Sequence, residues 1–232
     1  MGGVELSLLG GFVLTVSGRV VPAFPTAQRL LAFLAVQSRP AQRPHVAAVL
    51  WPDATPGRAA ANLRSALWRT HRLWPGLIVA YGQHVMLSAG VPVDLREARQ
   101  LADRLLDSGL DCADVLHAAA RVELAEDLLP DWPDEGWLTV ERENFRQMRM
   151  YALEALGERL IAAGRPGEAV AAGLAAVAAE PLRESAHRAV IRAHLAAGNR
   201  WAAARQYEQC RRVLREDLGL SPSAELRELA QA

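Results

Sequence analysis

One predicted helix, spanning residues 56–74, carries a row of side chains that can hydrogen-bond to bases and phosphates. The row consists of Arg58, Asn62, Ser65, Arg69 and Arg72. At about 100° per residue these side chains share roughly 80° of arc. Arginine can pair with guanine, asparagine with adenine and serine with several partners, and the remaining groups can hold phosphates. The row contains no acid, whereas the alternative, an ordinary solvated helix face, usually mixes both signs.

The opposite side of this helix is predicted to face a core. It carries apolar or small residues at helical spacing, namely Ala59, Ala60, Leu63, Ala66, Leu67, Thr70 and Trp74. Arg64 and Trp68 are expected on a flank between the two sides. Thr55 is a suitable N-cap and Pro56 suits the first helical position.

The segments around this helix predict its setting. Strands are expected at 4–9, 12–16 and 19–23, and helices at 27–37 (capped by Thr26), 45–50 and 56–74. A hairpin is then expected from strands 77–80 and 84–87. This order is typical of a winged helix-turn-helix, in which the third helix enters the DNA major groove. The predicted DNA-binding set is Arg43, Thr55, Arg58, Asn62, Arg64, Ser65, Arg69, Arg72 and, at the hairpin tip, Gln83 and His84, although a plain hairpin is equally compatible with the tip.

Charge is distributed unevenly along the chain, although its net formal charge is zero. Residues 1–93 contain eight arginines against Glu5 and Asp53, whereas the remainder contains eighteen arginines and twenty-four acids. Such an asymmetry indicates that the first part meets a polyanion. We therefore predict a DNA-binding domain at 1–93.

Residues 94–232 are predicted to form an all-α domain. Helices are expected at 94–107, 110–127, 137–163, 167–179, 184–197 and 200–217, and Ser221-Pro222 opens a last short helix. Ala162-Ala163-Gly164-Arg165 recurs 34 residues later as Ala196-Ala197-Gly198-Asn199, the period of tetratricopeptide helix pairs. The predicted fold class is mainly α with a small β component: a winged helix-turn-helix followed by a tetratricopeptide-like helical repeat.

Several motifs together resemble the Streptomyces antibiotic regulatory protein (SARP) family, whose members join an OmpR-like winged helix to a bacterial transcriptional activator domain. They are Leu50-Trp51-Pro52-Asp53, Ala61–Arg69, Leu128–Trp132, Glu141–Arg146, Ala179–Arg188, Gln206-Tyr207 and Glu216–Pro222. The resemblance implies the short form of the family. It departs at Thr70-His71-Arg72, where many relatives have a Leu-Arg-Arg stretch.

The resemblance also implies a function. It predicts a sequence-specific activator of secondary-metabolite genes that binds direct repeats in double-stranded promoter DNA. RNA polymerase holoenzyme, through its sigma factor, its alpha subunit or both, is the implied protein partner. A homodimer on DNA remains open, as do a repressor with the same DNA grip and a helical-repeat module whose winged helix docks protein.

An acidic and aromatic segment is the predicted partner-binding site. It contains Asp131, Trp132, Asp134 and Glu135, and a solvated loop is the alternative interpretation. The acidity of the second half would also repel DNA, which restricts the face that approaches it.

Other chemistry is not supported by residue types and spacing. The chain has no lysine and hence no Walker A motif, and no Ser/His/Asp, Cys/His or paired-carboxylate set is suitably spaced, so no enzyme is predicted. No cofactor or metal is expected, because His187 and His194 would have only Cys210 as a third ligand. Without a signal peptide or membrane span, a cytoplasmic, nucleoid-associated protein with free Cys112 and Cys210 is expected.

Overall fold

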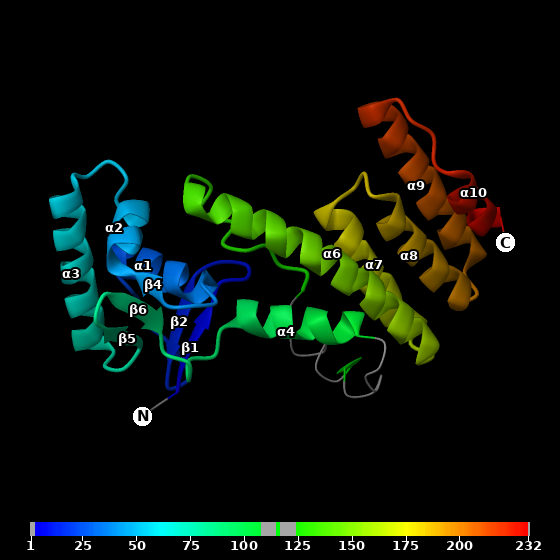
Figure 1. Cartoon of the computed structure of the whole chain (residues 1–232). Coiled ribbons are helices and arrows are strands. Elements are labelled where there is room, and N and C mark those ends of the chain that lie inside the picture. The colour runs from blue at the N-terminus through cyan, green and yellow to red at the C-terminus, as the bar shows by residue number, and fades with distance from the viewer. Residues whose placement is uncertain (1–2, 108–114, 117–123, 232) are drawn as a thin grey trace. The chain divides into compact units, whose positions relative to one another are not determined.

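The computed structural model describes residues 3–107, 115–116 and 124–231, and divides into two compact units (Figure 1). The first unit comprises Met1–Glu97 together with Asp127–Arg142, and the second comprises Ala98–Glu126 with Glu143–Ala232. The units therefore do not follow a single cut in the chain, because a segment beyond residue 126 packs with the N-terminal part.

Two small antiparallel sheets are present in the described part of the first unit. β1 (Val4–Ser7), β2 (Val13–Val16) and β3 (Arg19–Val20) pair in the order β1-β2-β3. β4 (Ala41–Gln42), β5 (Ile78–Tyr81) and β6 (His84–Leu87) pair in the order β4-β6-β5. Leu6 lies opposite Leu14 in the register of β1 and β2, and both side chains are buried. The sequence did not predict β4, because two residues are too few to show a period of two.

Three helices complete the first unit: α1 (Pro25–Val36), α2 (Arg43–Leu50) and α3 (Pro56–Leu73). Every residue of α1 from Leu30 to Val36 is buried, so α1 is the central helix of the unit. The prediction that Thr26 caps α1 is wrong, because the helix begins at Pro25 with Phe24 in the cap position. Proline is preorganised for the first helical turn, and the helix therefore starts earlier than expected.

α2 begins two residues earlier than the predicted start at His45. Pro44, which lies before the predicted start, occupies the first turn of α2. A proline is tolerated there because the backbone N–H that it lacks has no partner within the helix.

Residues 127–142 belong to the first unit because their backbone pairs with the residues directly after β1. Leu129 N donates to Leu8 O at 2.9 Å, and Gly10 N donates to Asp127 O at 2.8 Å. Arg142 donates to three backbone carbonyls of the same segment, which fixes its path. The last four residues of the predicted helix 110–127 are thus not helical, and most of the rest of that helix, with Cys112, lies outside the described residues.

The second unit consists of packed helices. Its elements, some of which begin in the first unit, are α4 (Asp94–Leu106), α6 (Thr139–Ala162, preceded by the 3₁₀ turn Gly136–Leu138), α7 (Pro166–Ala179), α8 (Glu184–Ala196), α9 (Arg200–Leu218) and α10 (Ala224–Gln231). α7 packs on α8, α8 on α9, and α10 on both α8 and α9. Ile191, Ala203, Cys210, Leu214 and Leu226 form a buried cluster among the last three helices.

The 34-residue period is visible in the backbone of the second unit. Gly164 and Gly198 both adopt a left-handed conformation, with φ of 74° and 72°, where α6 and α8 end. In both turns the residue after the glycine donates to the carbonyl five residues earlier, at 2.8 Å. Ala169 and Ala203, also 34 residues apart, are both buried. The predicted repeat of helix pairs is therefore confirmed.

A buried polar pair connects α8 and α9. His187 is fully buried, its Nε2 lies 2.8 Å from Pro181 O, and its Nδ1 lies 2.8 Å from the side-chain amide nitrogen of Gln206. One neutral tautomer satisfies both contacts, with Nε2 donating and Nδ1 accepting. Burial lowers the pKa of His187, against a smaller opposing effect of the Pro181 hydrogen bond. Both nitrogens thus serve packing, and the described residues contain no group of three or more His, Cys, Asp or Glu side chains that could hold a metal ion.

Candidate nucleic-acid interface

The residues that flank α3 determine where the helix begins and ends. Thr55 occupies the N-cap position with extended backbone, and its carbonyl accepts a hydrogen bond from Ala59 N at 2.8 Å. Pro56 takes the first helical position, as predicted. The helix ends before Trp74, whose backbone N–H still donates to Thr70 O, and Pro75 cannot continue it. The result is an 18-residue helix.

One side of α3 packs on α1 and α2. Its buried residues are Ala59, Leu63, Ala66 and Thr70, all of which were predicted to face the core. The other predicted core positions, Ala60, Leu67 and Trp74, are only partly buried. The buried stripe is therefore narrow, and a wide part of the helix surface stays accessible.

The predicted row of polar residues lies on the accessible part of α3. Arg58, Ser65, Arg69 and Arg72 are exposed, whereas Asn62 is partly buried. Arg64 is exposed as well. Among the described residues, no carboxylate lies within ion-pairing distance of any of the four arginines of α3. Their guanidinium groups are therefore available to a ligand from outside the chain.

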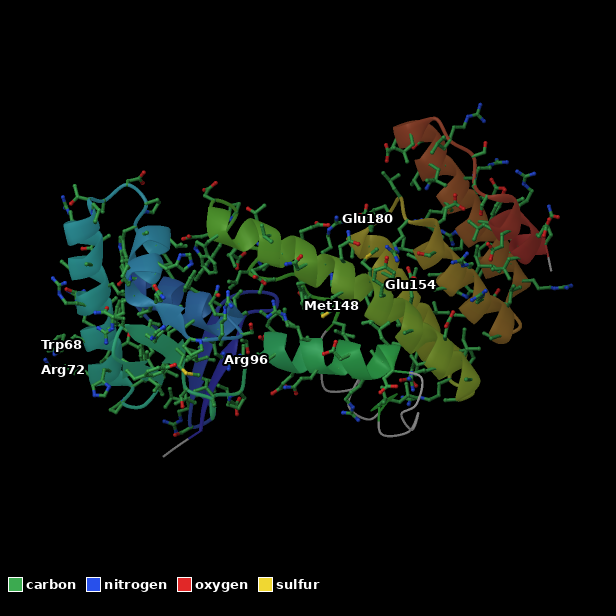
Figure 2. The ribbon with its side chains drawn as sticks, in the orientation of Figure 1. Trp68, Arg72, Arg96, Met148, Glu154 and Glu180 are labelled. Carbon is green, nitrogen blue, oxygen red and sulfur yellow. The ribbon has the colours of Figure 1, made fainter. Side chains whose placement is uncertain are left out.

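Trp68 lies at the centre of the accessible surface of α3 and not on its flank, where helical spacing predicts it. It is 61% exposed, and Figure 2 shows Trp68 and Arg72 projecting away from the rest of the first unit. The guanidinium of Arg72 lies 5.3 Å from the centroid of the Trp68 ring. Taking the mean direction of the buried residues, rather than of the polar ones, would have identified Trp68 as opposite the core.

Arg69 is restrained by a second cation–π contact. Its guanidinium carbon lies 5.9 Å from the centroid of the Phe24 ring, just before α1. Contacts of this kind hold the plane of the guanidinium without neutralising its charge. The N–H donors of Arg69 and Arg72 are thus available to a ligand while both guanidinium groups are held against a ring.

A groove of about 520 Å³ between α2 and α3 brings three further predicted residues together. Arg43, Arg64 and Gln83 line it, and its walls are mostly apolar. Arg43 N donates to Gln83 O at 2.8 Å, which connects α2 to the hairpin tip. The Nε atom of Arg43 is buried without a hydrogen-bond partner among the described residues. The groove therefore presents polar donors along an apolar floor.

The β5–β6 hairpin places Gln83 and His84 differently. Gly82 has a positive φ of 53°, which permits the tight turn. The side chain of Gln83 is exposed, but His84 is partly buried and stacks on Tyr81 with ring centroids 5.6 Å apart. Gln83 is the more accessible of the two.

The predicted partner-binding residues separate into two kinds. Glu135 accepts hydrogen bonds from Arg29 Nη2 at 3.0 Å and from Trp137 Nε1 at 2.6 Å. Trp132 stacks on Phe12, with ring centroids 5.9 Å apart. These two side chains hold the segment on the first unit, whereas Asp131 and Asp134 are exposed.

A second groove, of about 530 Å³, joins the two predicted sites within the first unit. Thr55 and Arg58 line it together with Asp134 and Glu135. The loop between α2 and α3, with Asp53, forms the remainder of its wall. The N-terminus of α3 is thus adjacent to the acidic segment, a proximity that residue spacing alone could not predict.

The comparisons with known proteins agree on the class that this fold defines. Residues 93–232 match the bacterial transcriptional activator domain (BTAD) family. Regulatory protein AfsR of Streptomyces coelicolor is 29% identical over 89% of the chain, and that of Streptomyces griseus is 26% identical over 87%. The chain spans 22% and 21% of these two relatives.

A solved structure confirms the architecture. Mycobacterium tuberculosis EmbR, in a complex with a low-affinity phosphopeptide, is similar with a TM-score of 0.76 and 23% identity. The match covers 100% of this chain and 65% of that one. The predicted fold class, a winged helix-turn-helix with a tetratricopeptide-like helical repeat, is therefore confirmed.

The fold thus has two parts, a winged helix and a helical repeat. The chain belongs to the bacterial transcriptional activator domain family, and its resemblance to the SARP family is confirmed. None of the helices in the described part of the chain is long and apolar enough to cross a membrane.

Proposed function

We propose that this chain is a sequence-specific DNA-binding transcriptional activator whose α3 enters the major groove. The observation that carries the proposal is the accessible surface of α3, with four arginines and no acid. A recognition helix needs unpaired donors on the side opposite its buried stripe, and α3 meets that requirement. The family membership independently supports a role in transcription.

We assign roles to the residues of α3 from their chemistry. Arg58, Asn62 and Ser65 lie on the N-terminal half of the helix, the part that reads base edges in a helix-turn-helix. Arg69 and Arg72, at the other end, suit phosphates. The remaining contacts to phosphates are assigned to Arg43, Thr55, Arg64, Gln83 and His84.

Selection from random double-stranded DNA tests the DNA-binding part of the proposal. The full chain should enrich one motif, and Asn62→Ala should relax the preference at one base position. Trp201→Ala, which alters an exposed tryptophan of the second unit, is the control and should enrich the same motif. If the wild-type chain enriched no motif, the proposal would fail and a protein-docking winged helix would be favoured.

Activation is the second part of the proposal. We propose that the chain binds promoters with direct repeats and activates secondary-metabolite genes. It would contact RNA polymerase holoenzyme through the sigma factor or the alpha subunit, and would bind DNA as a homodimer. The names of the Streptomyces relatives, which are regulatory proteins, support a regulatory output. Asp131 and Asp134 are the residues of the acidic segment that remain free to meet a partner.

In vitro transcription from a promoter carrying the selected motif tests activation. The wild-type chain should raise transcript levels, and Asp131→Ala with Asp134→Ala should reduce the rise while leaving DNA affinity within about twofold. A fall in transcript with the wild-type chain would identify a repressor. Asp217→Ala, an exposed acid on α9, serves as the control.

A further inference from the structure

α9 presents an exposed surface that the α3 assignment does not explain. Its buried residues are Ala203, Gln206, Cys210 and Leu214, which face the core shared with α8 and α10. The opposite side of the helix is open along its whole length. This exposed side is strongly basic, although residues 94–232 are acidic as a whole.

The basic surface forms a groove of about 460 Å³. Its lining consists of Arg205, Glu208, Gln209, Arg211, Arg212 and Arg215. Glu208 forms an ion pair with Arg211 at 2.7 Å and is thereby neutralised. Among the described residues, Arg205, Arg212 and Arg215 have no carboxylate within ion-pairing distance, even though Glu216 follows Arg212 by one turn.

Several other arginines of the second unit do have carboxylate partners. Arg146, Arg183 and Arg192, on neighbouring helices, form ion pairs with Glu180, Glu154 and Glu158. On the exposed face of α9, by contrast, three arginines without a carboxylate partner among the described residues lie in one groove. Such a concentration of one sign attracts a ligand of the opposite sign.

Apolar side chains lie at both ends of the arginine groove. Trp201 is 71% exposed, and the guanidinium of Arg205 lies 5.4 Å from its ring centroid. At the other end Leu218 and Leu220 are 51% and 57% exposed. Tryptophan and arginine together are enriched at the centres of protein–protein interfaces. Phosphate backbones, in contrast, give exposed leucines nothing to contact.

We propose that this face of α9 is a docking surface for an acidic protein segment that also carries apolar side chains. The carboxylates of the segment would pair with Arg205, Arg212 and Arg215, and its apolar residues would cover Trp201 and the two leucines. From Trp201 to Leu218 the surface is roughly 25 Å long, which suits a helix of about 17 residues. The proposal does not depend on DNA binding by α3.

Fluorescence anisotropy with a labelled synthetic peptide of about 18 residues, composed of Glu, Asp, Leu and Phe, tests the proposal on the full chain. The peptide should bind, and added salt should weaken binding. Arg212→Ala with Arg215→Ala should weaken it at least about tenfold, since the variant loses two charge-assisted contacts. Trp201→Ala should weaken it about fivefold.

The matched control is Arg165→Ala with Arg227→Ala, which removes the same charge elsewhere on the second unit and should change affinity less than twofold. Circular dichroism should show that both double variants keep their helix content, because alanine is a strong helix former. Absence of peptide binding, or equal binding by the two double variants, would overturn the proposal. So would a loss of affinity for a random DNA duplex as large as the loss for the peptide, since the surface would then be a nucleic-acid site.

Discussion

The arginines of α3 and those of the helical repeat are in contrasting environments. Arg58, Arg64, Arg69 and Arg72 have no carboxylate partner among the described residues. In the second unit Arg146, Arg165, Arg183, Arg188, Arg192 and Arg211 each lie within ion-pairing distance of a glutamate. The same residue type is therefore engaged in ion pairs at many positions of the second unit and remains available on α3.

This contrast shows why net charge describes the molecule poorly. A paired surface arginine contributes little beyond its own ion pair, because the glutamate cancels its field at a distance. Four unpaired arginines on one helix produce a local field that attracts a polyanion. Function is thus indicated by where arginines without carboxylate partners cluster in the described part of the chain, as they do on α3 and, in the second unit, on α9.

The largest effect is expected from removing the unpaired arginines. Changing Arg58, Arg64, Arg69 and Arg72 to alanine should weaken DNA binding about 1,000-fold, since each contact contributes about 1 kcal/mol or more. The control changes four paired arginines to alanine, namely Arg165, Arg188, Arg192 and Arg211. It alters net charge equally and should shift the Kd less than about threefold. Similar losses of affinity in gel-shift assays of the two variants would show that the unpaired arginines of α3 have no special role in DNA binding.

A smaller loss of DNA affinity is expected from changing Asn62, and its dependence on sequence shows whether this part of α3 contacts bases. Asn62→Ala should weaken binding to the selected duplex about tenfold, because a bidentate contact to a base discriminates by 1–3 kcal/mol. Binding to an unrelated duplex should hardly change. Trp68→Ala should weaken binding to both duplexes by a similar, smaller factor, because a tryptophan at the centre of the surface reads no base edge. Equal effects of Asn62→Ala on both duplexes would assign Asn62 to the phosphates.

The free energy of unfolding should depend on the paired arginines of the second unit and not on the unpaired arginines of α3. Arg183 forms an ion pair with Glu154 at 2.8 Å and lies 4.5 Å from the centroid of the Tyr151 ring. Arg183→Ala should lower the free energy of unfolding by about 1–2 kcal/mol, measured by urea denaturation. Arg58→Ala should change it by less than about 0.5 kcal/mol. Reversed results would mean that α3 uses its arginines for folding.

The smallest effect is expected from acidification, and it should arise in the second unit. Burial lowers the pKa of His187 below its ordinary value of 6.5. The unfolded chain therefore binds the proton more readily, so the contribution of neutral His187 is complete above about pH 6.5 and is lost as pH falls below it. Burial also lowers the pKa of His194, which acts in the same direction.

Thermal denaturation followed by circular dichroism at pH 7.5 and pH 5.5 measures this effect. The midpoint should fall on acidification, and His187→Gln, though less stable, should show a smaller fall. His71→Gln, on exposed α3, is the control and should keep the full wild-type fall. An undiminished fall in His187→Gln would remove His187 from the explanation.

Much of the fold could be predicted because short-range sequence patterns determine where many helices and turns begin and end. The helix boundaries of α3, the hairpin and the 34-residue repeat depend on prolines, glycines and apolar spacing within short windows. The start of α1 was missed because Pro25 and Thr26 offer competing signals. The pairing of residues 127–129 with the residues directly after β1 could not be foreseen, since it joins segments about 120 residues apart.

The candidate site was predicted in composition but not in arrangement. The polar row of α3 follows from helical spacing alone. The groove that unites Arg58 with Asp134, and the use of Glu135 by Arg29, depend on the return of residues 127–142 to the first unit. Trp68 was misplaced because its exposure depends on the direction of the whole buried stripe. Long-range packing, which a single sequence does not display, decides the groove and the Glu135 contact, whereas the position of Trp68 follows from spacing within α3.

The salt dependence of DNA binding shows whether the arginines of α3 contact phosphates. For the full chain, the logarithm of the association constant should fall steeply and linearly with the logarithm of salt concentration, because bound arginines release counterions from phosphates. Replacing Arg69 and Arg72 with alanine should reduce the slope by about two, whereas replacing Arg188 and Arg192 should leave it unchanged. A slope that the α3 variant preserves, or one that the second-unit variant reduces equally, would contradict the assignment of α3 as the DNA-binding surface.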